Sequence, residues 1–454
     1  MPTLAKVPAN DVRQGDSWEA VDRNRVCRAC ERRYPMPVGQ PRVYKVRFNQ
    51  GGTAYLLIVL LVLALLPVAI PSPAHAGQLH HYEYVFPDKS IYVYDMDHRG
   101  ALVKHVSVPT SAGVRGTVAS AVTGMLYISY GRDRGSGGSM LKYNLMTDEV
   151  VWAKHYPFGI DSMSISPDGN TIYMPTGELA SGGIWKVIDA KSGKVRTSID
   201  SGGIGPHNTV VSPDGARVYM GPRYTNYLVV ASTRTNRVIR RIGPVGGGGG
   251  IRPFTINGAQ NLAFITLSGF LGFQVGDIST GRILYTVPVQ GFRACGRGAS
   301  TPSHGISLSP DGKEVYLMDS INNYVHVFDI TGLRELAPRQ VADIRLLGAL
   351  SHNESPCAYD CLKDGWLHHS RDGRYVFVGD SGDVIDTTIR KTVMTLPALA
   401  NSRKEIEIDF EGGAPLPTWA MNNRSSIGGH AGMVRSSPFS GAADAIPMDL
   451  QMGS

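Results

Sequence analysis

Three side chains with acid–base and metal-binding chemistry recur at one position of a repeated pattern. Asp161, His207 and His304 each lie eight residues before the glycine of an Asp-Gly turn. Neutral imidazole is a common metal ligand and a general base near neutral pH, and a carboxylate can assist it in both roles. The shared spacing therefore predicts a polar site to which several copies of one structural unit contribute.

Related positions in the other copies add charged and aromatic groups. They are occupied by Arg115, Arg252, Trp366, His368 and His369. The side chains that we expect to bind a ligand are Asp161, His207, Arg252, His304, Trp366 and His368. His207 and His304 are the candidate metal ligands, and the sequence assigns no cofactor. In the alternative interpretation the histidines only bond to neighbouring units, because a structural role should recur in each copy and a catalytic role need not.

The repeated unit is marked by a short turn. Ser-Pro-Asp-Gly occurs at 166–169, 212–215 and 309–312, and Ser-Arg-Asp-Gly occurs at 370–373. Asp and Gly tolerate the backbone angles of a tight turn, and each turn precedes a short hydrophobic run. Each copy is therefore predicted to form a β-hairpin.

The spacing of the turns predicts the architecture. With two weaker copies, the turn glycines stand at 124, 169, 215, 258, 312 and 373, which gives intervals of 45, 46, 43, 54 and 61 residues. A period in the forties with four short strands is typical of a β-propeller blade. Six units lie between about 112 and 400, and strands near 82–108 and 404–410 can complete another. We predict an all-β propeller, with seven four-stranded blades and a ring closed by its N- and C-terminal strands.

The turn and the strand after it resemble a known group of repeats. Ser-Pro-Asp-Gly followed by Val-Tyr-Met (218–220) or Val-Tyr-Leu (315–317) is similar to the YVTN-type repeats of bacterial β-propellers, the YncE-like and lactonase-like proteins. The resemblance covers about 82–410. It implies the propeller fold, and it leaves the activity open because this fold serves binding proteins, lactonases, lyases and quinone-dependent dehydrogenases.

The N-terminal part predicts export. An apolar run at 54–70 follows Lys45 and Arg47 and precedes a small-x-small site that ends at Ala76. We expect a signal peptide cleaved after Ala76, or alternatively a membrane anchor at 54–70. The predicted division of the chain is a leader at 1–53, a signal peptide or anchor at 54–76, a propeller at 77–410 and a low-order tail at 411–454. The protein would then be periplasmic or extracellular.

The net charge does not predict a nucleic-acid partner. The whole chain carries 45 Lys and Arg against 38 Asp and Glu. Residues 1–76 hold ten of the basic and five of the acidic residues, so the remaining chain has 35 against 33, a net charge of +2. No basic stripe of the kind that binds nucleic acids is indicated. The expected partner is a small molecule or a protein at one mouth of the central channel.

Two long intervals of the repeat carry cysteines. Cys295 lies in one of them, and Cys357 and Cys361 lie in the other. An exported protein is expected to form a disulfide, and any two of these three thiols can pair. A metal site at Cys357 and Cys361 with a nearby histidine is the alternative. The sequence lacks Cys-x-x-Cys-His, the attachment motif for c-type haem.

These observations leave three hypotheses for the function. The first is an exported binding or scaffold protein with a polar ligand site at one mouth. The second is a hydrolase or lyase at the same mouth, with histidine as the base and an acid or a metal polarising a carbonyl. The third is a metal- or quinone-dependent oxidoreductase. The sequence does not decide whether the protein is an enzyme.

Overall fold

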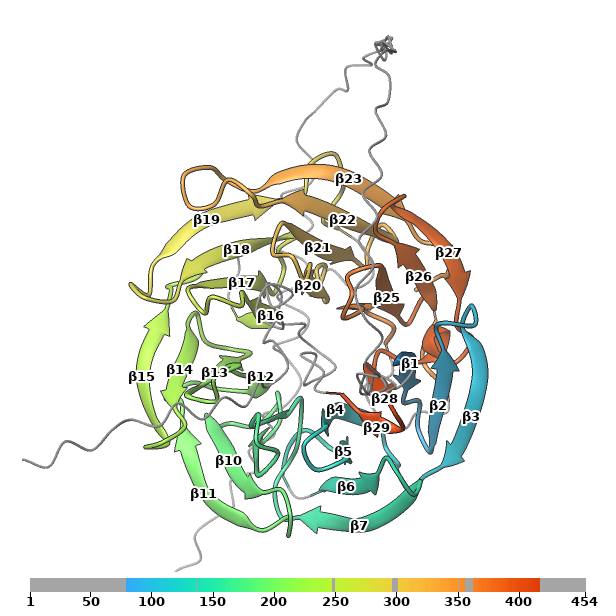
Figure 1. The fold of residues 1–454 in the computed structure, drawn as a ribbon. Helices are drawn as coiled ribbons and strands as arrows, with labels where there is room; N and C mark the ends of the chain where they lie inside the picture. The colour runs from blue at the N-terminus through green and yellow to red at the C-terminus, as the bar shows by residue number, and fades with distance from the viewer. Residues whose placement is uncertain are drawn as a thin grey trace, which may run out of the picture.

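The strands of the chain form a closed ring of seven antiparallel sheets (Figure 1). This computed structural model describes residues 79–135, 137–246, 250–295, 301–350, 352–355 and 362–416. Within these ranges the only helical element is one short 3-10 helix, η2 (Leu399–Asn401). The predicted all-β propeller of seven four-stranded blades is confirmed.

Each blade runs from an inner strand at the axis to an outer strand at the rim (Figure 1). Three blades consist of β4 (Val114–Ser120), β5 (Met125–Gly131), β6 (Gly138–Asn144) and β7 (Glu149–Tyr156); β8 (Ser164–Ile165), β9 (Thr171–Pro175), β10 (Ile184–Asp189) and β11 (Val195–Asp200); and β12 (Pro206–Val211), β13 (Arg217–Pro222), β14 (Leu228–Ser232) and β15 (Arg237–Ile242). Three more consist of β16 (Ile251–Ile256), β17 (Leu262–Leu267), β18 (Gly272–Asp277) and β19 (Ile283–Pro288); β20 (Ile306–Leu308), β21 (Glu314–Asp319), β22 (Tyr324–Asp329) and β23 (Arg339–Arg345); and β24 (Trp366–His369), β25 (Tyr375–Gly379), β26 (Asp383–Asp386) and β27 (Lys391–Thr395).

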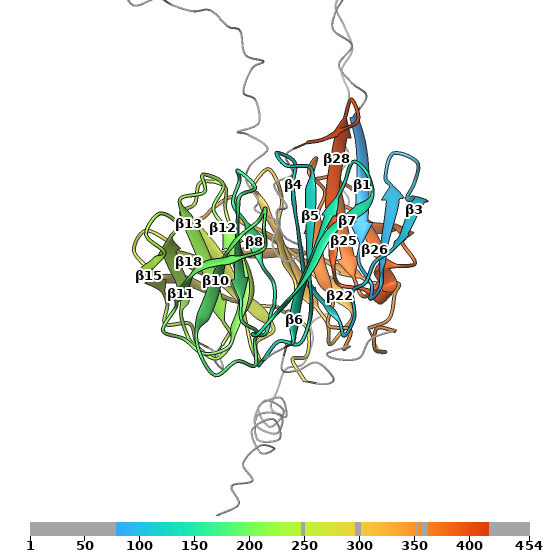
Figure 2. The ribbon, with the colours of Figure 1, turned by 90° about the horizontal axis from the view of Figure 1, so that it is seen from below.

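The two ends of the described chain share the remaining blade, which we call the closing blade. Its strands, from the axis outward, are β28 (Glu405–Glu411), β1 (Leu79–Val85), β2 (Ser90–Asp95) and β3 (Ala101–Ser107), and the short β29 (Ala414–Pro415) lies on the other side of β28. β28 pairs with β1 over seven positions, and the two strands lie side by side in both ribbon views (Figures 1 and 2). The predicted closure of the ring by both terminal strands is confirmed, and it removes an exposed sheet edge.

The Asp-Gly turns hold their hairpins through one recurring set of side-chain bonds. In the first, Ser166 Oγ donates to Asp168 Oδ1 at 2.5 Å and accepts from the Thr171 N–H at 2.9 Å. The glycine has φ +71°, and a Cβ there would lie 2.3 Å from Ser120 Oγ of the neighbouring blade. The serine–aspartate bond recurs in the other three turns, at 212, 309 and 370. These turns are structural.

Burial follows the position of a strand within its blade. The inner strands β12 and β16 are buried at each residue, because blades pack on both of their faces. The outer strand β27 alternates between exposed and partly buried residues. The hydrophobic clusters lie between neighbouring blades, as in the one that joins Ile406 and Ile408 of β28 to Leu126 and Ile128 of β5.

The other face of β28 is acidic and buried. Glu405, Glu407 and Asp409 alternate with the two isoleucines, and Glu83 lies opposite Glu407 on β1. We call these four residues the acidic face. No hydrogen-bond partner among the described residues reaches either carboxylate oxygen of Glu83. Burial and the neighbouring carboxylates, Glu405 first, raise the pKa of Glu83 well above its ordinary value, and burial likewise raises those of the other three.

Several predictions concern residues outside the described ranges. They are the leader at 1–53, the signal peptide or anchor at 54–76, most of the tail and the thiols Cys357 and Cys361. The disulfide and the export signal therefore stay predictions. Within the described ranges, no helix has the length and hydrophobicity needed to span a membrane.

Candidate functional site

Three inner strands carry a β-bulge close to their first residue. In β4 the pairing moves from Val114 to Gly116, and in β12 it moves from Pro206 to Asn208. β16 has a similar irregularity after Ile251. A bulge takes a residue out of the regular pairing and changes the direction of its side chain. The skipped residues are Arg115 in β4, His207 in β12, and both Arg252 and Pro253 in β16.

The loops that leave the second strand of each blade lie at the same end of the ring, because the second strand is antiparallel to the first. We call this end the start face. Asp133, Glu178, Arg223 and Ser268 follow β5, β9, β13 and β17 at intervals of 45 residues. The start face therefore has two sets of repeat-related positions, one at the beginning of the inner strands and one in these loops.

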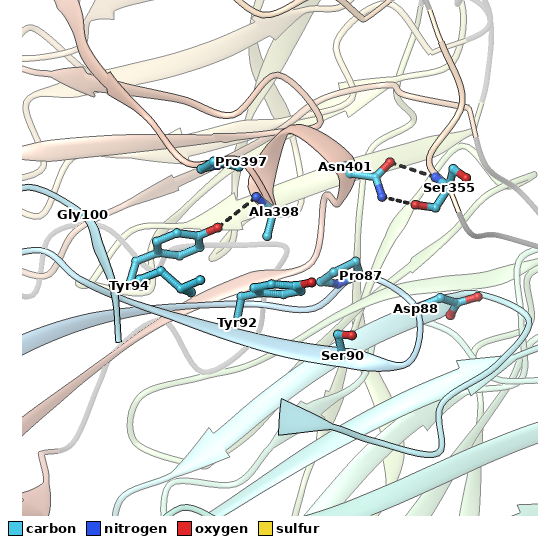
Figure 3. A pocket seen from close by; sticks show the side chains of 11 residues that line it. Pro87, Asp88, Ser90, Tyr92, Tyr94, Gly100, Ser355, Pro397, Ala398 and Asn401 are labelled. Carbon is cyan, nitrogen blue, oxygen red and sulfur yellow. Dashed lines mark hydrogen bonds between the residues drawn. The ribbon is translucent and has the colours of Figure 1, made fainter. Parts of the chain in front are cut away.

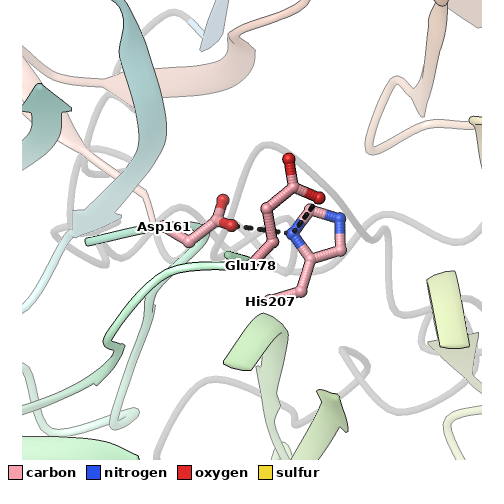
Figure 4. A group of neighbouring side chains, drawn as sticks. All are labelled: Asp161, Glu178 and His207. Carbon is pink, nitrogen blue, oxygen red and sulfur yellow. Dashed lines mark hydrogen bonds and ion pairs between the residues drawn. The ribbon is translucent and has the colours of Figure 1, made fainter. Parts of the chain in front are cut away.

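Residues of both sets meet in a buried group (Figure 4). His207 Nδ1 lies 2.8 Å from Asp161 Oδ2 and 3.8 Å from Glu178 Oε2. The exposed fractions of His207, Asp161 and Glu178 are 2%, 1% and 8%. We call these three residues the carboxylate–histidine cluster. Asp161 belongs to the segment before β8, Glu178 to the loop after β9 and His207 to β12, so two adjacent blades form the cluster.

Two arginines neutralise the cluster. Arg223 Nη1 lies 2.8 Å from Glu178 Oε2, and Arg252 Nη1 lies 3.5 Å from the same oxygen. Arg252 Nε also donates to Ser268 Oγ at 2.9 Å. Burial and the nearby Arg223 lower the pKa of Arg252 to about 10, so this guanidinium stays cationic at neutral pH. Two carboxylates are thus matched by two guanidinium groups.

The backbone around the cluster is fixed by neighbouring groups. Asp161 Oδ1 accepts a hydrogen bond from the Ser162 N–H at 2.8 Å, and Ser162 Oγ donates to the Arg115 carbonyl oxygen at 3.3 Å. The bond between His207 Nδ1 and Asp161 requires the imidazole proton on Nδ1 when the ring is neutral. Nε2 is then the basic nitrogen.

The structure brings together three of the six predicted ligand-binding residues, Asp161, His207 and Arg252. His304 packs edge-on against Trp366 with ring centroids 5.6 Å apart, and its Nδ1 lies 3.2 Å from the Gly365 carbonyl oxygen. These two residues form a separate pair, and His304 is absent from the metal-capable group found among the described residues.

His368 and His369 lie inside blade interfaces. The Glu407 N–H donates to His368 Nε2 at 3.4 Å, and His369 Nδ1 lies 2.7 Å from Ser307 Oγ. Burial lowers the pKa of each imidazole to about 3, so both rings are neutral at physiological pH. Both contacts join neighbouring blades.

Glu178 and Arg223 were not predicted from the sequence. They lie in loops without a recognisable motif, and their signal is the 45-residue interval that joins them to Asp133 and Ser268. That interval equals the first interval between the turn glycines. Glu178 lies nine residues after Gly169 and Arg223 lies eight after Gly215, so counting forward from each turn leads to within one residue of both.

A mutation at Gly177 is expected to disturb the cluster. Gly177 has φ +105°, and a Cβ there would lie 1.7 Å from the Asp133 carbonyl oxygen. Gly177→Ala should therefore lower the free energy of unfolding by about 2–4 kcal/mol, from backbone strain and overpacking together. Gly182→Ala is the matched control in the same loop, because its Cβ would meet only Ile184 at 3.9 Å. Equal denaturant midpoints for the two variants would contradict this expectation.

A pocket at the rim has fewer ionisable side chains than the start face. Its volume is about 530 Å³, and it lies where β2 approaches the segment around η2 (Figure 3). Its polar groups bond to one another: the Ala398 N–H donates to Tyr94 Oη at 2.9 Å, and the Ser355 N–H donates to Asn401 Oδ1 at 2.8 Å. Asp88 is the one ionisable carboxyl in its lining. We therefore place the candidate site at the start face.

Comparisons with known proteins support the fold and no particular activity. No family model matches the chain, and no curated protein matches it. The solved structures that match include hydrazine synthase of Kuenenia stuttgartiensis, at 18% identity and a TM-score of 0.45, over 63% of this chain and 79% of that one. Because 1610 solved chains match, the fold alone singles out no function. The resemblance to YVTN-type repeats is thus confirmed for the propeller fold, and the family itself is not.

Proposed function

We propose that this chain is an exported β-propeller binding protein that holds a small anionic ligand at one mouth of the ring. The carboxylate–histidine cluster and the arginines around it form the centre of the site. The observation that carries the proposal is the convergence of buried ionised side chains from separate blades. Buried charges cost several kcal/mol in desolvation and contribute little net stability, so such groups concentrate at functional sites.

The arginines favour an anion as the ligand. A guanidinium presents five N–H donors in a planar fork, which fits the oxygens of a carboxylate or a phosphate. Arg223 and Arg252 come from different segments and approach one carboxylate oxygen, Glu178 Oε2. The Glu178 side chain thus occupies the position of a small anion between two cationic groups. A ligand carboxylate or phosphate can use the same donors.

Thermal unfolding in the presence of small anions tests this proposal. Inorganic phosphate, acetate, succinate and oxalate serve as probes. An anion at about 100 times its dissociation constant should stabilise the protein by about 2.7 kcal/mol. Arg252→Gln should abolish that shift, because it removes a donor from the site. Arg237→Gln, a change at an exposed position of β15, should keep it.

Two outcomes would overturn the proposal. One is the absence of any stabilising anion among the probes. The other is a shift that Arg252→Gln and Arg237→Gln retain equally, because the anion would then bind elsewhere.

A hydrolase or lyase is the second candidate function, and the bond between Asp161 and His207 favours it. A carboxylate on Nδ1 orients an imidazole and leaves Nε2 as a general base, which typically contributes a factor of about 10²–10⁴ in rate. Turnover of a simple lactone or aryl ester that falls by such a factor in His207→Ala would assign the protein to this class. Ligand binding without turnover would keep it a binding protein.

Export and a disulfide belong to the same proposal. They rest on the apolar run at 54–70, the cleavage site after Ala76 and the thiols Cys295, Cys357 and Cys361. Intact mass of the secreted protein tests both features. A chain that begins at Gly77 and is two mass units lighter than its reduced form is expected.

A further inference from the structure

We infer that the carboxylate–histidine cluster binds a divalent transition-metal ion, and that this ion and the anion of the proposed function bind cooperatively. The inference rests on that proposed function for the anion only. The metal site itself follows from the donor atoms and their separations.

The three side chains offer a nitrogen and two oxygens at separations suited to one ion. Their donor atoms all lie within 4.8 Å of one another, and two of the separations are 2.8 and 3.8 Å. Ligand atoms about 2.1 Å from a common ion lie about 3–4 Å apart. Imidazole suits zinc and other first-row transition ions, and carboxylates suit manganese as well. Zn²⁺ and Mn²⁺ are therefore the expected occupants.

The surroundings hold two of these ligands in place. The Ser162 N–H bonds to the oxygen of Asp161 that does not face His207, and Arg223 bonds to Glu178. Carboxylates that bind metals are commonly fixed by such outer hydrogen bonds. The bulge at the start of β12 fixes the direction of His207.

An ion bound at Nδ1 requires the other tautomer of His207. The proton shared by His207 Nδ1 and Asp161 Oδ2 occupies the line between two prospective ligand atoms. A metal at Nδ1 must displace that proton, because only the deprotonated nitrogen binds an ion. The ring then carries its one proton on Nε2 and binds the ion as neutral imidazole.

Charge balance couples the ion to an anion. Asp161 and Glu178 are already matched by Arg223 and Arg252, so a divalent ion adds two uncompensated positive charges to a buried site. A bound carboxylate or phosphate compensates part of that excess. By linkage, the anion must raise metal affinity by the same factor by which the metal raises anion affinity, typically 5–150-fold.

Mn²⁺ binding to the purified protein, followed by the loss of the free-ion electron paramagnetic resonance signal, tests the inference. We expect one Mn²⁺ per chain and a dissociation constant that phosphate lowers at least about fivefold. Glu178→Gln and Asp161→Asn keep side-chain shape and should each weaken binding at least about tenfold. Exposed Glu149→Gln and His155→Ala, both on β7, should leave binding unchanged.

Each result separates the metal site from the proposed function. If wild-type protein binds neither Mn²⁺ nor Zn²⁺ stoichiometrically, or if folded Glu178→Gln binds as wild type does, the metal site is overturned. Anion stabilisation that persists unchanged after EDTA treatment overturns the coupling and leaves the binding function intact. Stoichiometric metal without any anion effect establishes the metal site and overturns both the coupling and the anion-binding function.

Discussion

A chain that ends at Ser402 is expected to lose its cooperative unfolding transition. This truncation removes β28, which pairs with β1 over seven positions and buries Ile406 and Ile408 fully between blades. Burying two isoleucines contributes about 3–6 kcal/mol, and each backbone group left unpaired in a buried position costs about 1–3 kcal/mol more. The sum reaches the net stability of a typical domain, about 5–15 kcal/mol.

Calorimetry and gel filtration of two truncated chains test this expectation. The chain that ends at Leu416 retains β28 and β29 and serves as the control, with a melting temperature close to that of the full chain. The chain that ends at Ser402 should elute as aggregate or unfolded monomer. A cooperative transition within a few degrees of the control would show that the ring does not depend on its closing strand.

Raising the pH above about 6.5 is expected to destabilise the propeller through the acidic face. Burial raises the pKa of Glu83, Glu405 and Glu407 well above the ordinary value of 4.5. Native protein therefore binds more protons than unfolded protein at higher pH, and stability falls as pH rises. Each such carboxyl contributes up to about 1.4 kcal/mol per pH unit, until the pH reaches its native pKa.

Two buried histidines act in the opposite direction below pH 6.5. The pKa values of His368 and His369 fall from 6.5 to about 3 in the native state. Unfolded protein then binds more protons than native protein between these values, so stability rises with pH in that window. Above about pH 6.5 the histidines add no further pH dependence. The loss of stability caused by the acidic face is then not offset.

Glu83→Gln tests whether the acidic face causes the loss of stability at high pH. The variant cannot ionise at this position, so its stability relative to wild type should increase from pH 4.5 to pH 8, by up to about 1.4 kcal/mol per pH unit. Glu411→Gln, at an exposed position of the neighbouring strand β28, is the control. Urea unfolding between pH 4.5 and pH 8 gives the pH dependence of the free energy of unfolding for each protein. Parallel curves for wild type and Glu83→Gln would contradict a raised native pKa for Glu83.

The fold could be predicted from the sequence because its signal is local and repeated. Each Ser-x-Asp-Gly turn fixes one hairpin through contacts within six residues, and the interval between turns fixes the blade. Ring closure was predictable because a single blade lacked one strand and the chain had one unassigned run, 404–410. No long-range side-chain contact was needed for either inference.

The candidate site could be predicted only in part. Counting back from the turns located Asp161 and His207 because the repeat places equivalent residues at the same height in each blade. The same count placed His304 with them, and His368 was added because it lies near the equivalent position of its own copy. The count could not show that the first packs on Trp366 and that the second accepts a bond from Glu407 of the closing blade. Those outcomes depend on neighbours brought together by the ring.

The acidic face shows a second limit of pattern analysis. The alternation of acids and isoleucines at 405–409 is typical of a strand with one face in water. In the ring, blades cover both faces of β28, so its acids are buried. A strand pattern reports which residues share a face, and the position of the strand in the architecture decides what that face contacts.

The recurring irregularity at the start of the inner strands has a consequence for how this repeated scaffold can vary. Arg115, His207 and Arg252 occupy comparable places in three copies of the repeated unit, yet they differ in charge and acid–base behaviour. The regular ladder resumes at Gly116, Asn208 and Phe254, and the rest of each strand carries the packing. A single codon change at such a place exchanges one functional group for another while the inherited scaffold stays intact. Duplicated units can thus acquire new chemistry independently of one another.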